Sequence, residues 1–270
     1  MKTKKLRSIK TPQTQTKNLS AQAPLCDMNA LGLRANTLDE LLALPRILPQ
    51  GLPIQRAKAL LESYASMLLE WSMTHNLTGA KDSTTLHANI IDSALPLGVI
   101  RDFGLCFDVG SGSGFPALVL AILRPKSILI LSEPRKKRVA FLYFIIQKLG
   151  LTNVAIYKER AQTYGLDSGA TLANILAPNN FAKIDTYKAD LITSRAALKS
   201  EQIFRATSHI LAKKGYYLLY KGLESGLQAY QYLTQKASLQ CCHSTKEDST
   251  TTQSIQLYQQ KMRVYLYCKG

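Results

Sequence analysis

Cysteine pairs and long apolar runs are scarce in this sequence, and each scarcity excludes a class of protein. The five cysteines are an odd number and form no Cys-x-x-Cys pair, which excludes a disulfide scaffold. The apolar runs are far shorter than the roughly 20 residues of a membrane-spanning helix, and the N-terminus lacks the apolar core of a secretory signal. Cys241-Cys242-His243 has no further ligands at a metal-binding spacing. We therefore expect a cytoplasmic protein without a membrane contact, a structural disulfide or a metal.

Acidic residues are also scarce. The chain has 18 Asp and Glu against 34 Lys and Arg, which gives a formal net charge of +16. Residues 1–20 hold six of the basic residues and no acid, so this segment explains only part of the excess. Such a charge indicates a polyanionic partner, and nucleic acid is favoured over a membrane surface because no strongly amphipathic basic helix is visible. A merely basic tail or proteome is the alternative.

The chain divides into an arm, a cap and a larger α/β domain. Residues 1–30 are polar and basic, which predicts a disordered arm. Residues 31–95 form a predicted helical cap, with apolar residues at helical spacing along residues 37–75 and a connection over residues 76–93. Residues 96–270 form the predicted α/β domain.

Strand-like and helix-like segments alternate from residue 96 onward. The predicted strands are residues 105–109, 127–131, 153–157, 189–193 and 216–220, followed by a C-terminal antiparallel hairpin of residues 254–258 and 263–268. This alternation predicts a mostly parallel seven-stranded sheet with right-handed crossovers and helices on both faces. Segments near residues 162–188 and 239–253 fit no element and are expected to be surface insertions.

Residues 107–115, Phe-Asp-Val-Gly-Ser-Gly-Ser-Gly-Phe, are the most informative segment. A buried strand is expected to end here in a turn made by Gly110, Gly112 and Gly114, followed by an apolar helix over residues 115–123. A glycine turn between a strand and a helix lets a ligand approach the backbone and meet its N–H groups. The segment therefore predicts a ligand site.

Two residues of this segment indicate which ligand it binds. A dinucleotide-binding turn needs glycine at its sixth position, where this chain has Phe115. Asp108, just before the turn, suits a cationic ligand and would repel a pyrophosphate. S-adenosylmethionine carries a sulfonium and an ammonium group and no phosphate. It fits the turn better than NAD.

Polar residues after the next two predicted strands complete the expected cofactor site. In an open parallel sheet, ligands bind at the carboxyl ends of the strands. Glu133 follows the second strand and is expected to accept two hydrogen bonds from a ribose diol, although an ordinary position beside a helix start is the alternative. After the third strand come Arg160, Ala161 and Gln162, where a polar side chain and a backbone N–H can recognise adenine.

Cations follow the remaining parallel strands, where the second substrate is expected. Arg195 follows the fourth strand and Lys221 the fifth. A structural alternative has Arg195 paired with an acid such as Asp190. Arg135–Arg138 are four consecutive cations at the predicted start of a helix, where the helix dipole disfavours positive charge. Contact with a phosphate backbone would explain them, although a solvated basic turn is the alternative. The candidate RNA-binding residues are Arg135, Lys136, Lys137, Arg138, Arg160 and Lys221.

A set of short motifs carries a resemblance to a known family. In chain order they are Asn76-Leu77-Thr78, Asp92-Ser93, FDVGSGSGFPALVLAI, KKRVAFL, LGLTNV, Arg160-Ala161, Ser194-Arg195-Ala196 and Lys221-Gly222. Together, over residues 50–270, they resemble the bacterial small-subunit ribosomal RNA guanine-N7 methyltransferases, also called glucose-inhibited division protein B. The chain departs from the family pattern at Gln162, where an acid is usual, and at Asn89, where a histidine is usual.

The resemblance implies a Rossmann-like class I methyltransferase that uses S-adenosylmethionine without a metal and acts on 16S rRNA or the small ribosomal subunit. It implies that Gly110 and Phe115 line the cofactor site, that Ala161 and Gln162 flank adenine, and that Arg195 lies by the methyl donor and the guanine. The expected cofactor-binding set is Asp108, Gly110, Gly112, Gly114, Phe115, Glu133, Ala161, Gln162 and Arg195. We expect a monomer.

The implied chemistry agrees with this set of residues. Guanine N7 has a free lone pair and no proton, so methyl transfer needs positioning and no general base, and Arg195 is the expected orienting residue. N7 faces the deep, narrow groove of an RNA helix, so the target guanine must be unstacked or in a loop. The alternatives are a methyltransferase of this fold with another substrate, a non-catalytic RNA-binding ribosome-assembly factor and, more distantly, an NAD-linked enzyme.

Overall fold

The computed structural model describes residues 25–75, 77–164, 188–195, 197–241, 255–260 and 263–269. Most of the predicted N-terminal arm and of both predicted insertions lies outside these residues, as do Asn76 and Ala196 of the family motifs. Among the helices in the described ranges, none combines the length and the apolar character needed to cross a membrane.

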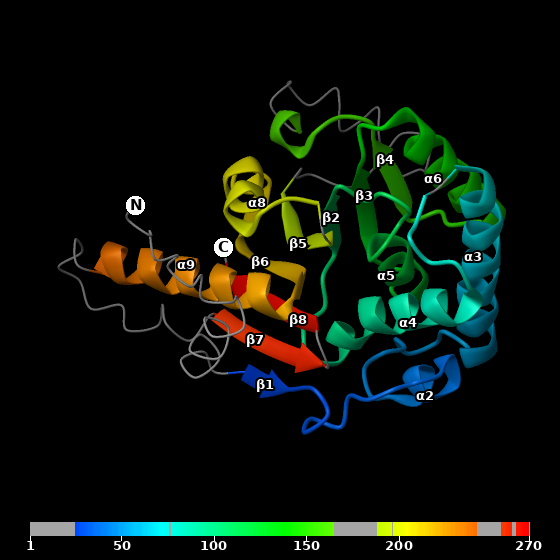
Figure 1. Ribbon diagram of the computed structural model, residues 1–270, viewed down its shortest axis with the longest axis horizontal. Coiled ribbons are helices and arrows are strands. Elements are labelled where there is room, and N and C mark those ends of the chain that lie inside the picture. Colours follow the sequence, from blue (N-terminus) through cyan, green and yellow to red (C-terminus); the bar gives the residue numbers. More distant parts are fainter. Residues whose placement is uncertain are drawn as a thin grey trace, which may run out of the picture.

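A mixed sheet forms the centre of the molecule (Figure 1), and its strand order is β1-β7-β8-β6-β5-β2-β3-β4. The strands are β1 Leu25–Asp27, β2 Leu105–Val109, β3 Ile128–Ser132, β4 Val154–Tyr157, β5 Ala189–Arg195, β6 Leu211–Gly222, β7 Ile255–Gln260 and β8 Arg263–Lys269. Strands β2 to β6 are mutually parallel, while β8 runs antiparallel to both β6 and β7. The predicted parallel sheet with an antiparallel C-terminal hairpin is confirmed.

Within the described residues the sheet has eight strands rather than the predicted seven, because β1 comes from the end of the segment predicted as a disordered arm. This strand pairs in parallel with β7, and the N–H of Met28 continues the pairing by donating to the Gln259 carbonyl at 3.0 Å. Met28 is fully buried. Three residues are too few to show a strand periodicity, and their partner strand lies at the other end of the chain.

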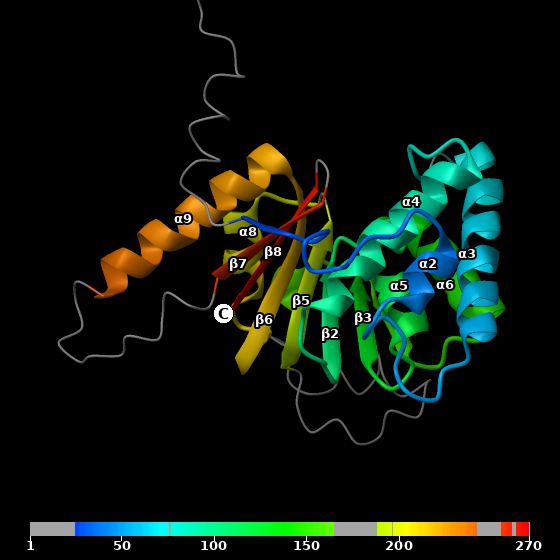
Figure 2. The same ribbon diagram turned by 90° about the horizontal axis from the view of Figure 1, so that it is seen from below.

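Helices cover both faces of the sheet. They are α2 Leu38–Ala43, α3 Ile54–His75, α4 Ser83–Ala94, α5 Ala117–Leu123, α6 Lys136–Leu149, α8 Ser200–Thr207 and α9 Leu223–Cys241. Figure 2 shows α2 to α6 gathered on one side of the molecule, with α8 and α9 lying across the other face of the sheet. The predicted α/β layering with a helical cap is confirmed.

The cap differs from its prediction in two places. The helical pattern over residues 37–75 is interrupted between α2 and α3, where Pro45, Pro49 and Pro53 remove backbone donors. The predicted connection over residues 76–93 contains α4, whose N-cap residue Asp82 accepts a hydrogen bond from the Thr85 N–H at 2.7 Å. This second difference matters most, because α4 contributes to the functional site.

Alternating side chains along the strands build two cores. In β2, Cys106 belongs to the core shared with α3 to α6, and Phe107 to the core shared with α8 and α9. Neighbouring strands follow the same alternation, with Leu129 and Leu191 on the first face and Ile192 on the second. Burying a large apolar side chain contributes roughly 1.5–3 kcal/mol, so this packing fixes the strand register. The carboxyl ends of β2 to β5 are thereby held side by side.

Candidate functional site

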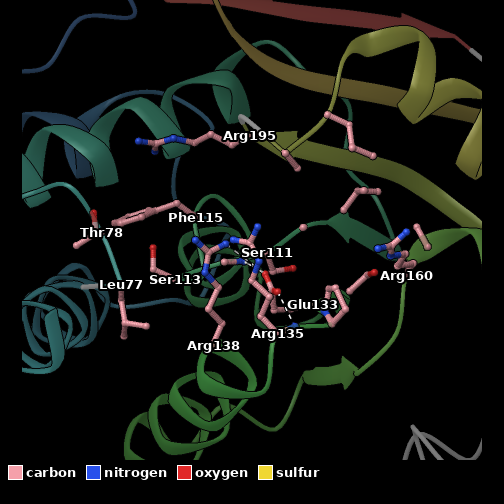
Figure 3. Close-up of a pocket in the computed structure, with 18 of the residues that line it drawn as sticks. Leu77, Thr78, Ser111, Ser113, Phe115, Glu133, Arg135, Arg138, Arg160 and Arg195 are labelled. Carbon is pink, nitrogen blue, oxygen red and sulfur yellow. Dashed lines mark hydrogen bonds and ion pairs between the residues drawn. The ribbon is translucent and has the colours of Figure 1, made fainter. Parts of the chain in front are cut away.

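A pocket of about 760 Å³ opens at the carboxyl ends of β2 to β5 (Figure 3). Most of the predicted site residues line it, namely Gly110, Gly112, Phe115, Glu133, Arg135, Arg138, Arg160, Ala161, Gln162 and Arg195. Its volume is in the range of small-molecule and cofactor sites. The structure therefore brings together residues that are far apart in the sequence.

The glycine turn folds over the end of β3 and presents its backbone to the pocket. The N–H groups of Gly110 and Ser111 donate to the Ser132 carbonyl at 2.9 and 3.1 Å. Gly112 has a φ of +59°, which favours glycine, and a Cβ there would lie 3.4 Å from the Arg138 guanidinium. A side chain at Gly112 would thus occupy the space through which a ligand approaches the turn.

Glu133 is the carboxylate that orders this turn. It is only 2 % exposed, and its Oε2 accepts from the Gly112 N–H while its Oε1 accepts from the Arg135 N–H, both at 2.9 Å. The Arg138 guanidinium lies 3.7 Å from Oε2. Each carboxylate oxygen has a second lone pair, so Glu133 can also accept from a ligand diol. Its predicted contact with a ribose remains a prediction.

Asp108 lies beneath the turn and is not among the residues that line the pocket. It is 1 % exposed, and its Oδ1 accepts a hydrogen bond from the Thr193 hydroxyl at 2.6 Å. Within the described residues its Oδ2 has no hydrogen-bond partner. Burial raises the pKa of this carboxyl to about 7. The sequence predicts that Asp108 faces the positive charge of a ligand. In the structure its carboxyl group is buried, and whether it is ionised depends on its surroundings.

Arg195 projects along the Phe115 ring at the wall of the pocket, with its Cζ 5.1 Å from the ring centroid (Figure 3). Its Nη1 lies 3.5 Å from Asp92 Oδ2 and 3.3 Å from the Ser93 hydroxyl, and its Nη2 donates to Asn89 Oδ1. Desolvation lowers the pKa of the guanidinium, and the charge of Asp92 opposes that shift. Helix α4 therefore holds Arg195 in the pocket wall.

The structural alternative for Arg195, an ion pair with an acid, is present with Asp92, and only its suggested partner Asp190 is wrong. Asp190 Oδ2 instead accepts from the Gly104 and Leu105 N–H groups at 2.9 and 3.0 Å, at the opposite end of the strands.

Lys221 does not lie where its predicted RNA contact needs it. The side chain is 7 % exposed, and its Nζ donates to the Leu198 carbonyl at 2.9 Å. Burial also lowers the pKa of this amine. Leu198 lines the pocket, so Lys221 supports the pocket wall from behind. By contrast, Lys136 and Lys137 are exposed at the start of α6, beyond the pocket lining.

The cap contributes site residues that sequence reasoning missed. Leu77 and Thr78, between α3 and α4, line the pocket. The Tyr64 hydroxyl donates to the Ser113 carbonyl at 2.8 Å, and its ring lies 5.2 Å from that of Phe115. Helical periodicity identified Tyr64 only as part of an apolar face. The family motif at residues 76–78 was the one signal for Leu77 and Thr78.

Gly114 also supports the site without lining the pocket. Its φ is +101°, and a Cβ there would lie 2.4 Å from the Leu118 side chain and 3.0 Å from the Tyr64 hydroxyl. The turn can therefore pack against the cap only with glycine at this position.

Comparison with known protein families shows which family the chain belongs to. The family described as rRNA small subunit methyltransferase G matches residues 57–258. The chain belongs to this family. The predicted resemblance, the methyltransferase fold and the enzyme class are therefore confirmed.

Two similar curated methyltransferases show how far the likeness extends. Ribosomal RNA small subunit methyltransferase G of Helicobacter pylori (strain ATCC 700392 / 26695) is 42 % identical over 163 residues, which are 60 % of this chain and 81 % of that protein. The protein of the same name from Aliarcobacter butzleri is 29 % identical over 211 residues, covering 77 % and 88 % of the two chains. In both comparisons the matched region covers most of the length of the related protein.

A solved structure agrees with the fold of this chain. A methyltransferase from Geobacter sulfurreducens has a TM-score of 0.50 at 13 % identity, covering 91 % of this chain and 98 % of that one. Across the described ranges of our chain, no three His, Cys, Asp or Glu side chains gather as a metal site would require. The absence of a metal remains a prediction.

Proposed function

We propose that the chain transfers the methyl group of S-adenosylmethionine to N7 of a guanine in 16S rRNA of the small ribosomal subunit. The observation that carries the proposal is the pocket itself. It joins the glycine turn, Glu133 and the Ala161-Gln162 pair to Arg195 in a chain of the rRNA methyltransferase G family.

The residues present fit S-adenosylmethionine. Gly112 leaves the turn open to a ligand, Glu133 retains acceptor lone pairs for a ribose, and Gln162 offers an amide for adenine. Asp108 has a buried oxygen that finds no hydrogen-bond partner among the described residues, and a cation above the turn would favour its ionised form. When bound, the donor supplies an electrophilic methyl group on a sulfonium. Gly112, Glu133 and Gln162 would hold it in a fixed orientation, with Asp108 acting from beneath the turn through its charge.

The chain's own contribution to the transfer is orientation. Guanine N7 attacks through its lone pair and releases no proton, so none of the pocket residues has to act as a base. The Arg195 guanidinium has five N–H donors, of which only some are taken up by α4. The others are available to guanine O6 or a phosphate. A contact with N7 itself is disfavoured, because methylation makes the purine cationic.

The rim of the pocket supports an RNA substrate. Arg135, Arg138 and Arg160 line the pocket, and Lys136 and Lys137 lie exposed beside it. These cations can neutralise phosphates on either side of an extruded nucleotide. The alternative of a small-molecule substrate gives no role to such a rim.

Methyl transfer from labelled S-adenosylmethionine to small ribosomal subunits tests the proposal. Subunits purified from cells lacking this protein should acquire N7-methylguanosine in 16S rRNA, identified by mass spectrometry of nuclease digests. Label in a protein or a small molecule instead would overturn the proposed substrate. Tight binding to subunits without transfer would favour the assembly-factor alternative.

We also propose that the chain acts as a monomer in the cytoplasm, where its proposed substrate is assembled. Light scattering of the active enzyme should give the mass of one chain, and a dimer mass would contradict the monomer.

A further inference from the structure

We propose that Asp92 is a positioning residue for methyl transfer, because its carboxylate fixes the Arg195 guanidinium in the pocket wall. The proposal rests on the proposed function and assigns a task to the Asp92-Ser93 motif. Asp92 does not line the pocket that holds Arg195, so it acts through that side chain.

The first argument is the geometry of α4. Asn89, Asp92 and Ser93 are three and four residues apart, so they share one face of the helix. All three side chains contact the Arg195 guanidinium. Asp92 Oδ2 is 3.5 Å from Nη1, the Ser93 hydroxyl is 3.3 Å from Nη1, and Asn89 Oδ1 accepts a hydrogen bond from Nη2. Asp92 is the one negative charge among these three partners.

The second argument is that Asp92 is itself anchored from the other side. Its Oδ1 accepts from the Tyr265 hydroxyl at 2.8 Å and from Arg263 Nε at 3.2 Å, both from β8. This leaves Oδ2 directed at Arg195. A carboxylate with one oxygen held by the sheet offers the guanidinium a fixed partner rather than a mobile one.

The third argument is the shape of the wall. Asn89, Asp92 and Arg263 line a second cavity of about 680 Å³. Arg195 lines the first pocket and not this cavity, so the Asp92–Arg195 pair lies in the wall between the two. Because Arg195 and Asp92 are 15 % and 16 % exposed, their attraction is less screened than that of a surface pair. This attraction adds to the hydrogen bonds of Asn89 and Ser93 in holding the guanidinium over Phe115.

The fourth argument is energetic. Burying a cation is costly, and a well-packed apolar side chain at this position would stabilise the fold at least as well as an ion pair. Arg195 and Asp92 nevertheless form one beside the pocket. We infer that the pair serves the orientation of the substrate, for which the planar guanidinium must hold a single direction.

Asp92→Asn tests the proposal, because it removes the charge and leaves an oxygen for Tyr265 and Arg263. We expect the single-turnover rate of methyl transfer to fall about 10-fold, less than the roughly 100-fold that a misplacement of about 1 Å costs. The dissociation constant for S-adenosylmethionine, measured by calorimetry, should stay within about twofold. A residue that only stabilises the fold would change the melting temperature and leave the rate per folded molecule unchanged.

A double-mutant cycle assigns the effect to Arg195. In an Arg195→Lys background, which is already slow, adding Asp92→Asn should lower the rate by no more than about twofold. The matched control is Asp39→Asn, which removes a carboxylate from its ion pair with Lys58 at 2.7 Å in the cap and should leave the wild-type rate unchanged. If Asp92→Asn does not fold, Asn89→Ala removes another partner of Arg195 and should slow transfer several-fold.

Two outcomes would overturn the positioning role while the proposed function stands. One is a wild-type rate in Asp92→Asn. The other is an equal loss from Asp92→Asn in the wild-type and Arg195→Lys backgrounds. If the wild-type protein forms no N7-methylguanosine at all, the proposed function fails, and the positioning role fails with it.

Discussion

The two sides of the pocket use charge in opposite ways. On the side of the glycine turn, at the ends of β2 and β3, the buried charged residues are the acids Asp108 and Glu133. At the ends of β5 and β6, they are the cations Arg195 and Lys221, held by Asp92 and by the Leu198 carbonyl. Glu133 orders the backbone of the glycine turn and Asp108 lies buried beneath it, whereas the two cations are held in place by the cap and the pocket wall. A charged residue at the end of a strand thus indicates that the site is near, but its position does not show what that residue does there.

The largest expected effect is on the side of the glycine turn. Gly112→Val should weaken S-adenosylmethionine binding by about 100-fold or more, roughly 2.8 kcal/mol, because the side chain would fill the approach to the turn at a φ of +59°. Calorimetry on the folded variant measures this loss.

Gly150→Val is the matched control for this change. Its φ is +62°, but a Cβ there meets nothing within 4 Å. It should cost about 1–2 kcal/mol of stability and leave cofactor affinity intact. Equal affinities in the two variants would remove Gly112 from the cofactor site.

The second largest effect is on the cationic side. Arg195→Lys keeps the charge but loses the planar fork that α4 holds, so the single-turnover methylation rate should fall about 30- to 150-fold, or roughly 2–3 kcal/mol. Cofactor affinity and melting temperature should change little. A near-wild-type rate would show that Arg195 has only a structural task.

A smaller effect concerns the pH dependence of Asp108. Because its pKa is raised to about 7 in the folded protein, its contribution to stability is present at low pH and is lost as the pH rises through 7. Thermal melts of the free enzyme from about pH 4 to 8 should show wild type losing stability relative to Asp108→Asn.

Ligand binding should show the opposite trend at Asp108. A cationic ligand favours the carboxylate, so wild-type affinity for S-adenosylmethionine should rise with pH across this range. The Asn variant should bind more weakly above pH 7 and show a flatter profile. Parallel pH profiles would contradict the role of this charge.

The smallest effect separates the exposed from the buried cations. Replacing Lys136 and Lys137 by Gln should lower the slope of log K against log salt for RNA binding by about 1.4 if both contact phosphates of a single strand. Lys221→Gln should leave the slope unchanged, because Lys221 is buried against Leu198. A reduced slope for Lys221→Gln would restore its predicted RNA contact.

The glycine-turn side could be predicted from the sequence because its contacts are local. The Gly112–Glu133 hydrogen bond joins residues 21 positions apart, within one strand–helix–strand unit whose pattern is visible. The cationic side could not be predicted in the same way. Arg195 and Asn89 are 106 positions apart, and Arg263 and Asp92 are 171 apart, so no periodicity reports on them. The pairing of β1 with β7, at the other end of the chain, was missed for the same reason.

The most direct test of the central claim is a map of N7-methylguanosine in 16S rRNA from cells without this protein, complemented with the wild-type chain or with Gly112→Val. The account predicts one N7-methylated guanine that is lost in the deletion, restored by wild type and absent with Gly112→Val. An identical pattern of N7 methylation in all strains would contradict it.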